Sequence, residues 1–452
     1  MTGIDLATEG DDLNAHYDAL AERWILTDRI ADYSHLVTPS GNSNEPIHRW
    51  FHFKEGYSWA LIPRLLKDSP SLPRDQLAIL DPFLGSGTTL VSSLMLGREE
   101  GFSVRGLGIE RNPAIYAIAV AKVNAALKGV SLLEAISSAE NAFWKEYKRL
   151  IRRRQDLSTS STTLNNLDYF DANHVHSLLA LGRASRVIDE VDVRAIFQAC
   201  VAAVVEPAGR VRRDGRALRY MSKKRVVDPQ AAFKERLAKC VNDISCLPDP
   251  SRHATAEVLQ DDARGVGAIA AGFDANLIVF SPPYPNNIDY TEVYKMEAWA
   301  LELYADVDEL KNQRLRTIRS HPSLRFSDDY AFMQNDFKNP VVSLISPILD
   351  SVPDDRYQRG RRQVISGYAD DMLKVLCGLR NVAAVGSYCA IVVGNSIHGT
   401  GTQRFVIAAD LILARLAELA GWRVEEIRVA RLLRRRATDA DHLRESVVVL
   451  RS

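Results

Sequence analysis

The sequence predicts an α/β protein in which helices cover both faces of a mostly parallel sheet. Two short apolar runs, 77–81 and 276–280, each end in a tight polar turn, which is typical of buried parallel strands. A glycine turn and a helical pattern follow the first run and continue to residue 97. Because parallel strands need a crossover connection between them, this alternation favours a sheet with helices on both faces.

The elements around the first strand follow the same logic. Residues 1–45 predict a polar helical extension that ends in a loop, and residues 46–67 are rich in aromatic and aliphatic side chains. The run 104–109 predicts a second strand. Asn112-Pro113 then suits the cap and first turn of another helix.

The alternation breaks at two places and returns at the end. Residues 131–255 predict an inserted region of helical pieces, and residues 303–365 predict a second, irregular insertion rich in Arg, Asp and Pro. A strand at 256–259 lies between them. The last part predicts, in order, a strand at 388–393, a helix at about 404–420, and a terminal antiparallel hairpin of 423–430 and 445–451.

Length and composition set broad limits. The 452 residues exceed the usual size of a single core, so one large decorated domain or two domains are expected. The formal net charge is zero, so a nucleic-acid role must depend on local basic patches. The five cysteines show no CxxC spacing, which predicts no metal site and a reducing, cytoplasmic location. No apolar run reaches about 18 residues, so we expect no membrane span.

The turn at residues 81–89 has the features of a ligand site. Gly85 and Gly87 let the backbone approach a ligand closely, and the hydroxyls around them can cap the next helix. Glu110 closes the second strand, where an acid can accept hydrogen bonds from ribose hydroxyls. Neither the GxxxxGK[ST] phosphate loop nor the GxGxxG dinucleotide pattern occurs at this turn.

The motif Asp-Pro-Phe-Leu-Gly-Ser-Gly-Thr-Thr at 81–89 and the motif Ser-Pro-Pro-Tyr at 281–284 resemble those of S-adenosylmethionine-dependent amino-methyltransferases that act on DNA. The resemblance implies a Rossmann-like class I methyltransferase sheet. Its cofactor-binding half would be 46–130, its catalytic half 256–302, and its C-terminal part 366–452. The residues implied for S-adenosylmethionine are Asp81, Phe83, Gly85, Gly87, Thr88, Glu110, Phe53 and Asp262, with Asp261 as the alternative to Asp262.

The Ser-Pro-Pro-Tyr segment suits methyl transfer to an aromatic amine. The lone pair of such an amine is delocalised into its ring, so fixed acceptors for its N–H groups favour attack on the methyl group. Ser281 and the carbonyl of Pro282 supply acceptors, and Pro282 and Pro283 fix the backbone. Tyr284 offers a face on which a base can stack. In duplex DNA the target base would have to be flipped out.

The first residue of this motif bears on the target base. In the resembled family, Ser at the first position of this motif, which is residue 281 in this chain, is more associated with cytosine N4. Asp or Asn at that motif position is more associated with adenine N6. We therefore expect a DNA cytosine-N4 methyltransferase, with adenine N6 as the alternative. The cofactor motif precedes the catalytic motif in this chain, whereas many family members with this style of cofactor motif have the reverse order. This departure bears on the subgroup and not on the reaction.

A basic stretch at 209–225 is the first candidate for contact with double-stranded DNA, because phosphate binding needs a local density of positive charge. The insertion 303–365 is the alternative region for target recognition. The expected DNA-binding residues are Arg210, Arg212, Arg213, Arg216, Arg219, Tyr220, Lys223, Lys224 and Arg225.

Two other interpretations stay open. Guanine-N2 methyltransferases of transfer RNA share an Asp-Pro-Phe-x-Gly-Ser-Gly turn and a Pro-Pro-Tyr motif, but they usually carry a separate N-terminal RNA-binding domain. A non-catalytic DNA-binding subunit would be expected to have lost residues such as Ser281 or Gly85. The expected context is restriction–modification or host defence, with a partner nuclease or defence-system subunit as the candidate protein partner.

Overall fold

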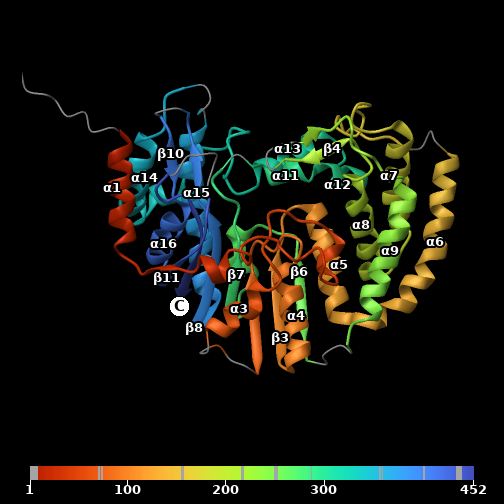
Figure 1. Ribbon diagram of the computed structural model, residues 1–452, viewed down its shortest axis with the longest axis horizontal. Coiled ribbons are helices and arrows are strands. Elements are labelled where there is room, and N and C mark those ends of the chain that lie inside the picture. The colour runs from red at the N-terminus through yellow and green to blue at the C-terminus, as the bar shows by residue number, and fades with distance from the viewer. Residues whose placement is uncertain are drawn as a thin grey trace, which may run out of the picture. The chain divides into compact units, whose positions relative to one another are not determined.

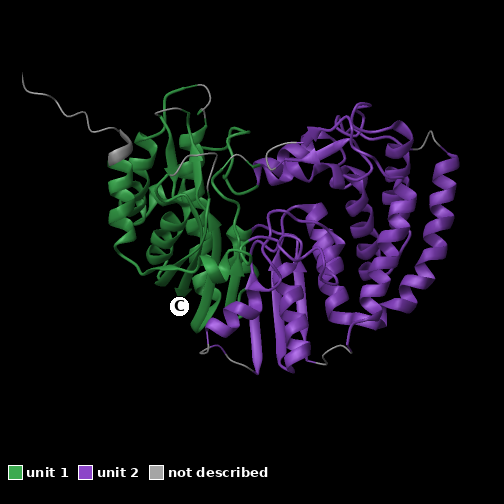
Figure 2. Cartoon of the chain, viewed as in Figure 1, with its two compact units in different colours: residues 1–37, 263–288, 317–452 green, residues 38–262, 289–316 purple. Residues whose placement is uncertain are grey.

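The structure of this chain is a computed structural model (Figure 1). It describes residues 9–69, 72, 75–153, 157–214, 218–248, 253–286, 288–355, 358, 360–400, 403–433 and 440–452. The chain divides into two compact units (Figure 2). Unit 1 comprises residues 1–37, 263–288 and 317–452, and unit 2 comprises residues 38–262 and 289–316.

Unit 2 contains three parallel strands in the order β2 (Gln76–Asp81), β3 (Ser103–Ile109) and β6 (Thr255–Leu259). The helices α3 (Leu61–Asp68), α4 (Thr88–Glu100) and α5 (Pro113–Lys128) connect or cover them. A Cβ atom at Gly106 would come within 2.9 Å of Leu90, so glycine lets α4 pack closely on β3. Asn112 caps α5 by accepting hydrogen bonds from two main-chain amides, which confirms the predicted helix start.

The rest of unit 2 is mainly helical. Phe143, Phe197 and Phe233 come from three of its helices and form a buried aromatic cluster. A short antiparallel hairpin of β4 (Val211–Arg213) and β5 (Leu218–Tyr220) interrupts the helices. The helices are η1 (His48–Trp50), α6 (Leu133–Arg152), α7 (Ala172–Ser185), α8 (Val191–Val205), α9 (Pro229–Ser245), α11 (Tyr290–Val293), α12 (Lys295–Ala300) and α13 (Val307–Leu315).

Unit 1 contains five strands in the order β1 (Leu26–Asp28), β11 (Arg423–Leu432), β12 (Arg444–Arg451), β8 (Ala383–Gly394) and β7 (Ala275–Phe280). The pairs β7–β8 and β1–β11 are parallel, whereas β12 is antiparallel to both of its neighbours. A separate hairpin pairs β9 (Ser396–His398) with β10 (Phe405–Ile407). The helices are α1 (Glu9–Ala21), α2 (Ile30–Tyr33), α10 (Val266–Ile269), α14 (Lys338–Asp350), α15 (Arg361–Val382) and α16 (Ala409–Leu419).

These elements confirm the predicted α/β class with a mostly parallel sheet and a terminal antiparallel hairpin. Two local expectations are wrong. The helix expected from about residue 404 begins only at Ala409, because 405–407 pairs with 396–398 as a strand. The segment 303–365, expected to be irregular, contains α13, whose polar sequence has almost no apolar face, and α14, whose apolar helical pattern is interrupted by Pro347.

One helical stretch among the described residues, Pro113–Arg152, is long and apolar enough to cross a membrane by length and composition. Within its most apolar window, 67% of the residues are buried in the structure. The α5 portion of this stretch packs against α8 and β6. Such burial is that of a core helix, which passes the same test as a membrane span.

Candidate functional site

The turn after β2 has the backbone geometry that its glycines predicted. Gly85 has a φ angle of +55° and Gly87 one of +91°, in the left-handed region that glycine adopts without strain. A Cβ atom at Gly85 would lie 2.8 Å from the Phe53 ring, and one at Gly87 would lie 3.3 Å from Val123 of α5. Both glycines therefore provide space as well as conformation.

Glu110, at the end of β3, is held by main-chain amides on both sides. The amide of Gly85 donates to one carboxylate oxygen at 3.0 Å, and the amide of Asn112 donates to the other at 2.7 Å. Burial raises the pKa of Glu110 to about 7, against the lowering effect of these amides. Since a carboxylate oxygen has two lone-pair directions, each oxygen keeps acceptor capacity for a further donor.

Asp81 lies at the centre of a buried cluster beneath the turn. Its carboxylate accepts a hydrogen bond from the amide of Phe83 at 2.9 Å, and further ones from the hydroxyls of Thr89 and Tyr57. Burial raises the pKa of Asp81 to about 7. The hydroxyls of Tyr57 and Thr89 are also in contact, and their two protons are shared among these three contacts, so three side chains and one amide fix the start of α4.

Sequence reasoning did not single out Tyr57, although it stands in the aromatic segment 46–67 of the expected cofactor-binding half. A phenol is a common partner for a buried carboxylate, and that signal could have found it. Thr88, which was selected instead of Thr89, is buried at the first position of α4, and Phe83 is half-buried in the turn.

Phe53 lies beside the turn and belongs to an aromatic stack. Its ring is stacked on Tyr294 with a centroid separation of 5.2 Å, and its edge meets Gly85. Tyr294 bonds to Glu55, and the guanidinium of Arg213 lies 4.8 Å from the Tyr294 ring. These contacts fix the Phe53 ring against the glycine turn.

The two acids after β6 differ in exposure and in partners. Asp262 is half-buried and forms an ion pair with Arg111 at 3.1 Å. Asp261 is exposed, and its carboxylate accepts a hydrogen bond from the amide of Asp262 at 2.7 Å. Asp262 is thus the better fixed of the two alternatives.

The unit 2 residues fit S-adenosylmethionine in their donor set. Glu110 keeps acceptor capacity for ribose hydroxyls, and Phe53, which packs closely on Gly85, supplies an apolar wall. Asp262 has acceptor oxygens for an adenine amine. No group of three or more His, Cys, Asp or Glu side chains suited to a metal occurs among the described residues.

The Ser-Pro-Pro-Tyr segment follows β7 in unit 1 and is held by a chain of side-chain hydrogen bonds. The hydroxyls of Ser281 and Tyr284 are 3.2 Å apart, and Tyr284 donates to the carboxylate of Glu445 at 3.2 Å. Arg431 forms an ion pair with the same carboxylate at 2.7 Å. Because the Tyr284 proton points to Glu445, the Ser281 proton points to the Tyr284 oxygen.

That proton order leaves the lone pairs of Ser281 available as acceptors. The Tyr284 ring rests on Gly394 of β8, where a Cβ atom would lie 2.9 Å from the ring. The following residues are also tied down: Ser396 donates to the carbonyl of Pro285, and Arg361 donates to the carbonyl of Asn286. Sequence reasoning missed Glu445 and Gly394, because both are distant in the chain.

The basic stretch 209–225 divides by environment. Arg212, Arg219, Tyr220, Lys223 and Arg225 are exposed on or beside the β4–β5 hairpin, and Tyr220 stacks on Tyr169. Arg219 lies near Asp214, and Arg210 pairs with Asp171 at 3.2 Å. Arg216 lies outside the described residues.

Two members of this stretch differ from the expectation of contact with DNA. Arg213 is buried and forms ion pairs with Glu206 and Glu297, so its charge is already balanced within unit 2. Lys224 is half-buried and donates to the carbonyls of Glu206 and Val211 at 2.7 and 2.6 Å. The basic residue types of this stretch did not predict these internal contacts, because the partner residues come from other elements.

Comparisons with known proteins agree with the motifs. The chain is 24% identical over 454 residues to the Type II methyltransferase M.BsoBI of Geobacillus stearothermophilus, which covers 86% of this chain and 81% of the relative. It is 23% identical over 480 residues to the Type II methyltransferase M.AvaI of a Nostoc strain, which covers 94% of this chain and 92% of the relative. No family model matches the chain.

Among solved structures, the rRNA methyltransferase AviRa of Streptomyces viridochromogenes matches at 11% identity with a TM-score of 0.29. The match covers 91% of this chain and 92% of that one, but so low a score carries no argument about fold or function. The sequence relatives support a relationship to Type II methyltransferases along most of the chain. Methyltransferases of this class use S-adenosylmethionine, which confirms the expected cofactor.

Proposed function

We propose that this protein is a site-specific DNA methyltransferase that transfers the methyl group of S-adenosylmethionine to the N4 amine of a cytosine in double-stranded DNA. The observation that carries the proposal is the hydrogen-bonded chain Ser281–Tyr284–Glu445, in which the serine proton is directed to Tyr284 and the serine lone pairs are left as acceptors. An aromatic amine needs such an acceptor before its lone pair can attack. The relatives named as Type II methyltransferases support the same reaction class.

The cofactor residues have separate tasks in this proposal. Glu110 accepts hydrogen bonds from the ribose hydroxyls, Asp262 accepts from the adenine amine, and the Phe53 ring limits water. Asp81, Thr88 and the two turn glycines hold the loop in its shape at the methionine end. The bound cofactor supplies an electrophilic methyl group on a sulfonium.

The residues after β7 act on the base. Ser281 and the carbonyl of Pro282 accept the two N–H groups of the amine, which localises the lone pair on nitrogen. The positive charge that would develop on the nitrogen as it takes up the methyl group would lie near these two acceptors. Pro282 and Pro283 keep the acceptors fixed, and the Tyr284 ring stacks on the flipped-out base. One amine proton then leaves to solvent.

Adenine N6 is the alternative target. Its amine has the same two N–H groups, and the Ser281 hydroxyl is neutral, so the hydrogen-bond order favours neither base by itself. The preference for cytosine depends on the identity of residue 281 in the motif that this chain resembles. Guanine N2 of RNA and a non-catalytic role are less favoured, because all four residues of the segment are present, and Ser281 and Tyr284 are tied into one network with Glu445.

We also propose that the exposed side chains of the β4–β5 region contact the DNA backbone. Arg212, Arg219, Lys223 and Arg225 can neutralise phosphates, and Tyr220 can stack. The segments 131–255 and 303–365 are the candidates for target recognition. A cytoplasmic location, and a partner nuclease of a restriction–modification system, complete the proposal.

The decisive experiment is to incubate the protein with S-adenosylmethionine and unmethylated genomic DNA, and then to identify methylated nucleosides by mass spectrometry. N4-methylcytosine is the expected product, and the Ser281→Ala variant should form far less of it. N6-methyladenine would keep the mechanism and overturn the target. Methylation of an RNA sample alone would overturn the proposed substrate.

A further inference from the structure

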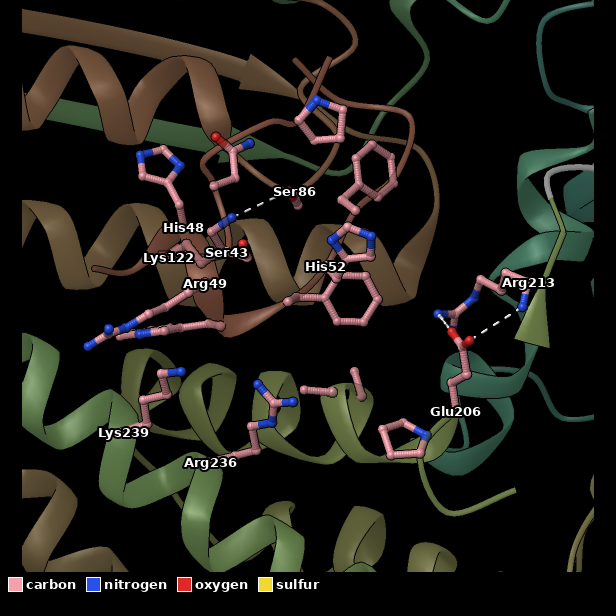
Figure 3. A pocket seen from close by; sticks show the side chains of 18 of the residues that line it. Ser43, His48, Arg49, His52, Ser86, Lys122, Glu206, Arg213, Arg236 and Lys239 are labelled. Atoms are coloured by element: carbon pink, nitrogen blue, oxygen red, sulfur yellow. Dashed lines mark hydrogen bonds and ion pairs between the residues drawn. The ribbon is translucent and has the colours of Figure 1, made fainter. Parts of the chain in front are cut away.

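Unit 2 contains a cavity of about 460 Å³ beside the glycine turn (Figure 3). Its wall comes from the segment 39–53, Ser86, Lys122, the end of α8 and α9. Residues 206–207, 213 and 224–227, which follow α8 in the chain, complete the wall. The volume lies in the range of small-molecule sites and is too small for a DNA duplex. The cavity therefore suits a compact ligand or one projecting group of a larger one.

The charge of the cavity wall is unbalanced. Five basic side chains have no ion-pair partner among the described residues: Lys122, Lys224, Arg225, Arg236 and Lys239. The two remaining arginines of the wall already have ion-pair partners: Arg49 pairs with Asp243, and Arg213 pairs with Glu206 and Glu297. Glu206 is the one acidic side chain in the wall, and it is engaged by Arg213.

Two buried groups face this excess of charge without adequate partners. Lys122 is 1% exposed, and its ammonium has a single, long hydrogen bond of 3.4 Å to Ser86. His48 is 5% exposed, and its Nδ1 atom has no hydrogen-bond partner in the part of the chain that the structure describes. Burial lowers the pKa of Lys122 to about 7 and that of His48 well below its ordinary value. A buried ammonium without a counter-ion is destabilising, so Lys122 loses its proton more readily unless an anionic ligand compensates the charge.

Arg236 and Lys239 lie one helical turn apart on α9, and Figure 3 shows both side chains rising from that helix into the cavity. A guanidinium offers a planar pair of donors, and an ammonium offers a compact point charge. A tetrahedral oxyanion can accept hydrogen bonds from the guanidinium and the ammonium at once. The Lys122 ammonium and the Ser86 hydroxyl lie deeper in the wall.

We propose that this cavity binds a phosphate group, with Arg236 and Lys239 at its entrance and Lys122 at its end. The phosphate comes either from the backbone of bound DNA or from a free phosphate compound. The cavity wall includes Phe53 and Ser86, which border the glycine turn, but Arg236, Lys239 and Lys122 have no role in the proposed methyl transfer. Ser86 connects the cavity with the glycine turn, because it belongs to the turn and bonds to Lys122.

The test is calorimetric titration of the whole protein with inorganic pyrophosphate at low ionic strength. Saturable binding is expected, and it should weaken as salt is added. The double variant Arg236→Gln with Lys239→Gln should lose roughly 100-fold in affinity, about tenfold for each charge-assisted hydrogen bond. Lys234→Gln is the matched control, because Lys234 is exposed on the same helix and is not part of the cavity wall.

Both substituted side chains are half-buried at most, so the double variant should fold, and its circular dichroism and melting temperature should match those of the Lys234→Gln control. Absence of saturable pyrophosphate binding would overturn the proposal. Equal binding by the double variant and the control would do the same. Displacement of pyrophosphate by S-adenosylmethionine would also contradict it, since the cavity would then belong to the cofactor site.

Competition with a short duplex identifies the source of the phosphate. If the duplex displaces pyrophosphate from the wild-type protein, the backbone of DNA supplies the group. If pyrophosphate and duplex bind together, a free phosphate compound does. Failure of the proposed methyl transfer leaves the pyrophosphate titration unaffected, so the two proposals fail separately.

Discussion

The glycine turn of unit 2 and the Ser-Pro-Pro-Tyr segment of unit 1 both follow a strand end, but they are held in different ways. In the turn, main-chain amides of Gly85 and Asn112 fix the Glu110 carboxylate. In the segment, side-chain hydroxyls of Ser281 and Tyr284 lead to the Glu445 carboxylate. The first arrangement depends on backbone shape and the second on individual side chains.

This difference separates binding from chemistry. A site built from amides tolerates side-chain changes but not changes of backbone conformation, because the donors move together. A site built from hydroxyls keeps its shape when one oxygen is removed, and it loses only that hydrogen bond. Substitutions in the turn should therefore affect cofactor affinity, and substitutions in the segment should affect the rate of transfer.

The largest effect is expected at Ser281. Ser281→Ala removes an acceptor used mainly in the transition state, so kcat should fall by about 10²- to 10³-fold. The dissociation constant of S-adenosylmethionine should not change, and single-turnover kinetics with equilibrium binding measures both. Ser396→Ala is the control, since that hydroxyl bonds to the Pro285 carbonyl nearby. A wild-type kcat would remove Ser281 from the mechanism.

Gly85→Ala should break the turn. The left-handed backbone costs about 1–2 kcal/mol with a Cβ atom, and the contact with Phe53 adds about 1–3 kcal/mol. Affinity for S-adenosylmethionine should fall by roughly 10- to 100-fold, measured by calorimetry. Gly101→Ala is the matched control, because its φ angle is +80° and no atom lies within 4 Å of the added carbon. Equal losses of cofactor affinity in Gly85→Ala and Gly101→Ala would show that backbone strain alone, and not the contact with Phe53, causes the effect.

Glu110 should make cofactor affinity depend on pH. Its pKa is raised to about 7 by burial, and donation from ribose hydroxyls favours the charged form. Binding therefore releases a proton, and affinity should rise by up to about tenfold from pH 6 to pH 8. Glu110→Gln should flatten this rise. Asp81 has a similarly raised pKa, so a slope that persists in the variant would assign the proton to Asp81.

The smallest effect is expected from Tyr284→Phe, which keeps the ring but cuts the connection between Ser281 and Glu445. The variant removes two hydrogen bonds, and loss of the one to Ser281, of about 1 kcal/mol, should lower kcat by about fivefold, with unchanged affinity for S-adenosylmethionine. Tyr294→Phe in unit 2 provides the contrast, because Tyr294 supports Phe53 and should alter cofactor affinity instead. A loss of cofactor affinity in Tyr284→Phe, or a loss of kcat alone in Tyr294→Phe, would contradict the separation of binding from chemistry.

Local sequence was enough for the strands and for the two turns that follow them. Apolar runs of five or six residues, the positive-φ glycines and the Asn112 cap are signals contained within a few positions, so their positions could be predicted. The same local signals failed at 405–407, where a short apolar run pairs as a strand before α16 begins.

Tertiary structure decided which side chains meet. Glu445 reaches Tyr284 across 161 residues, and Arg213 reaches Glu297 across 84, so neither pairing leaves a periodic trace in the sequence. The basic cavity likewise gathers side chains from separate segments whose charges look like solvated faces when read singly. The sequence by itself determined the strand-and-turn chemistry, because backbone preference is local. Only the folded chain decided the partners, burial and charge balance, because these depend on contacts between distant residues.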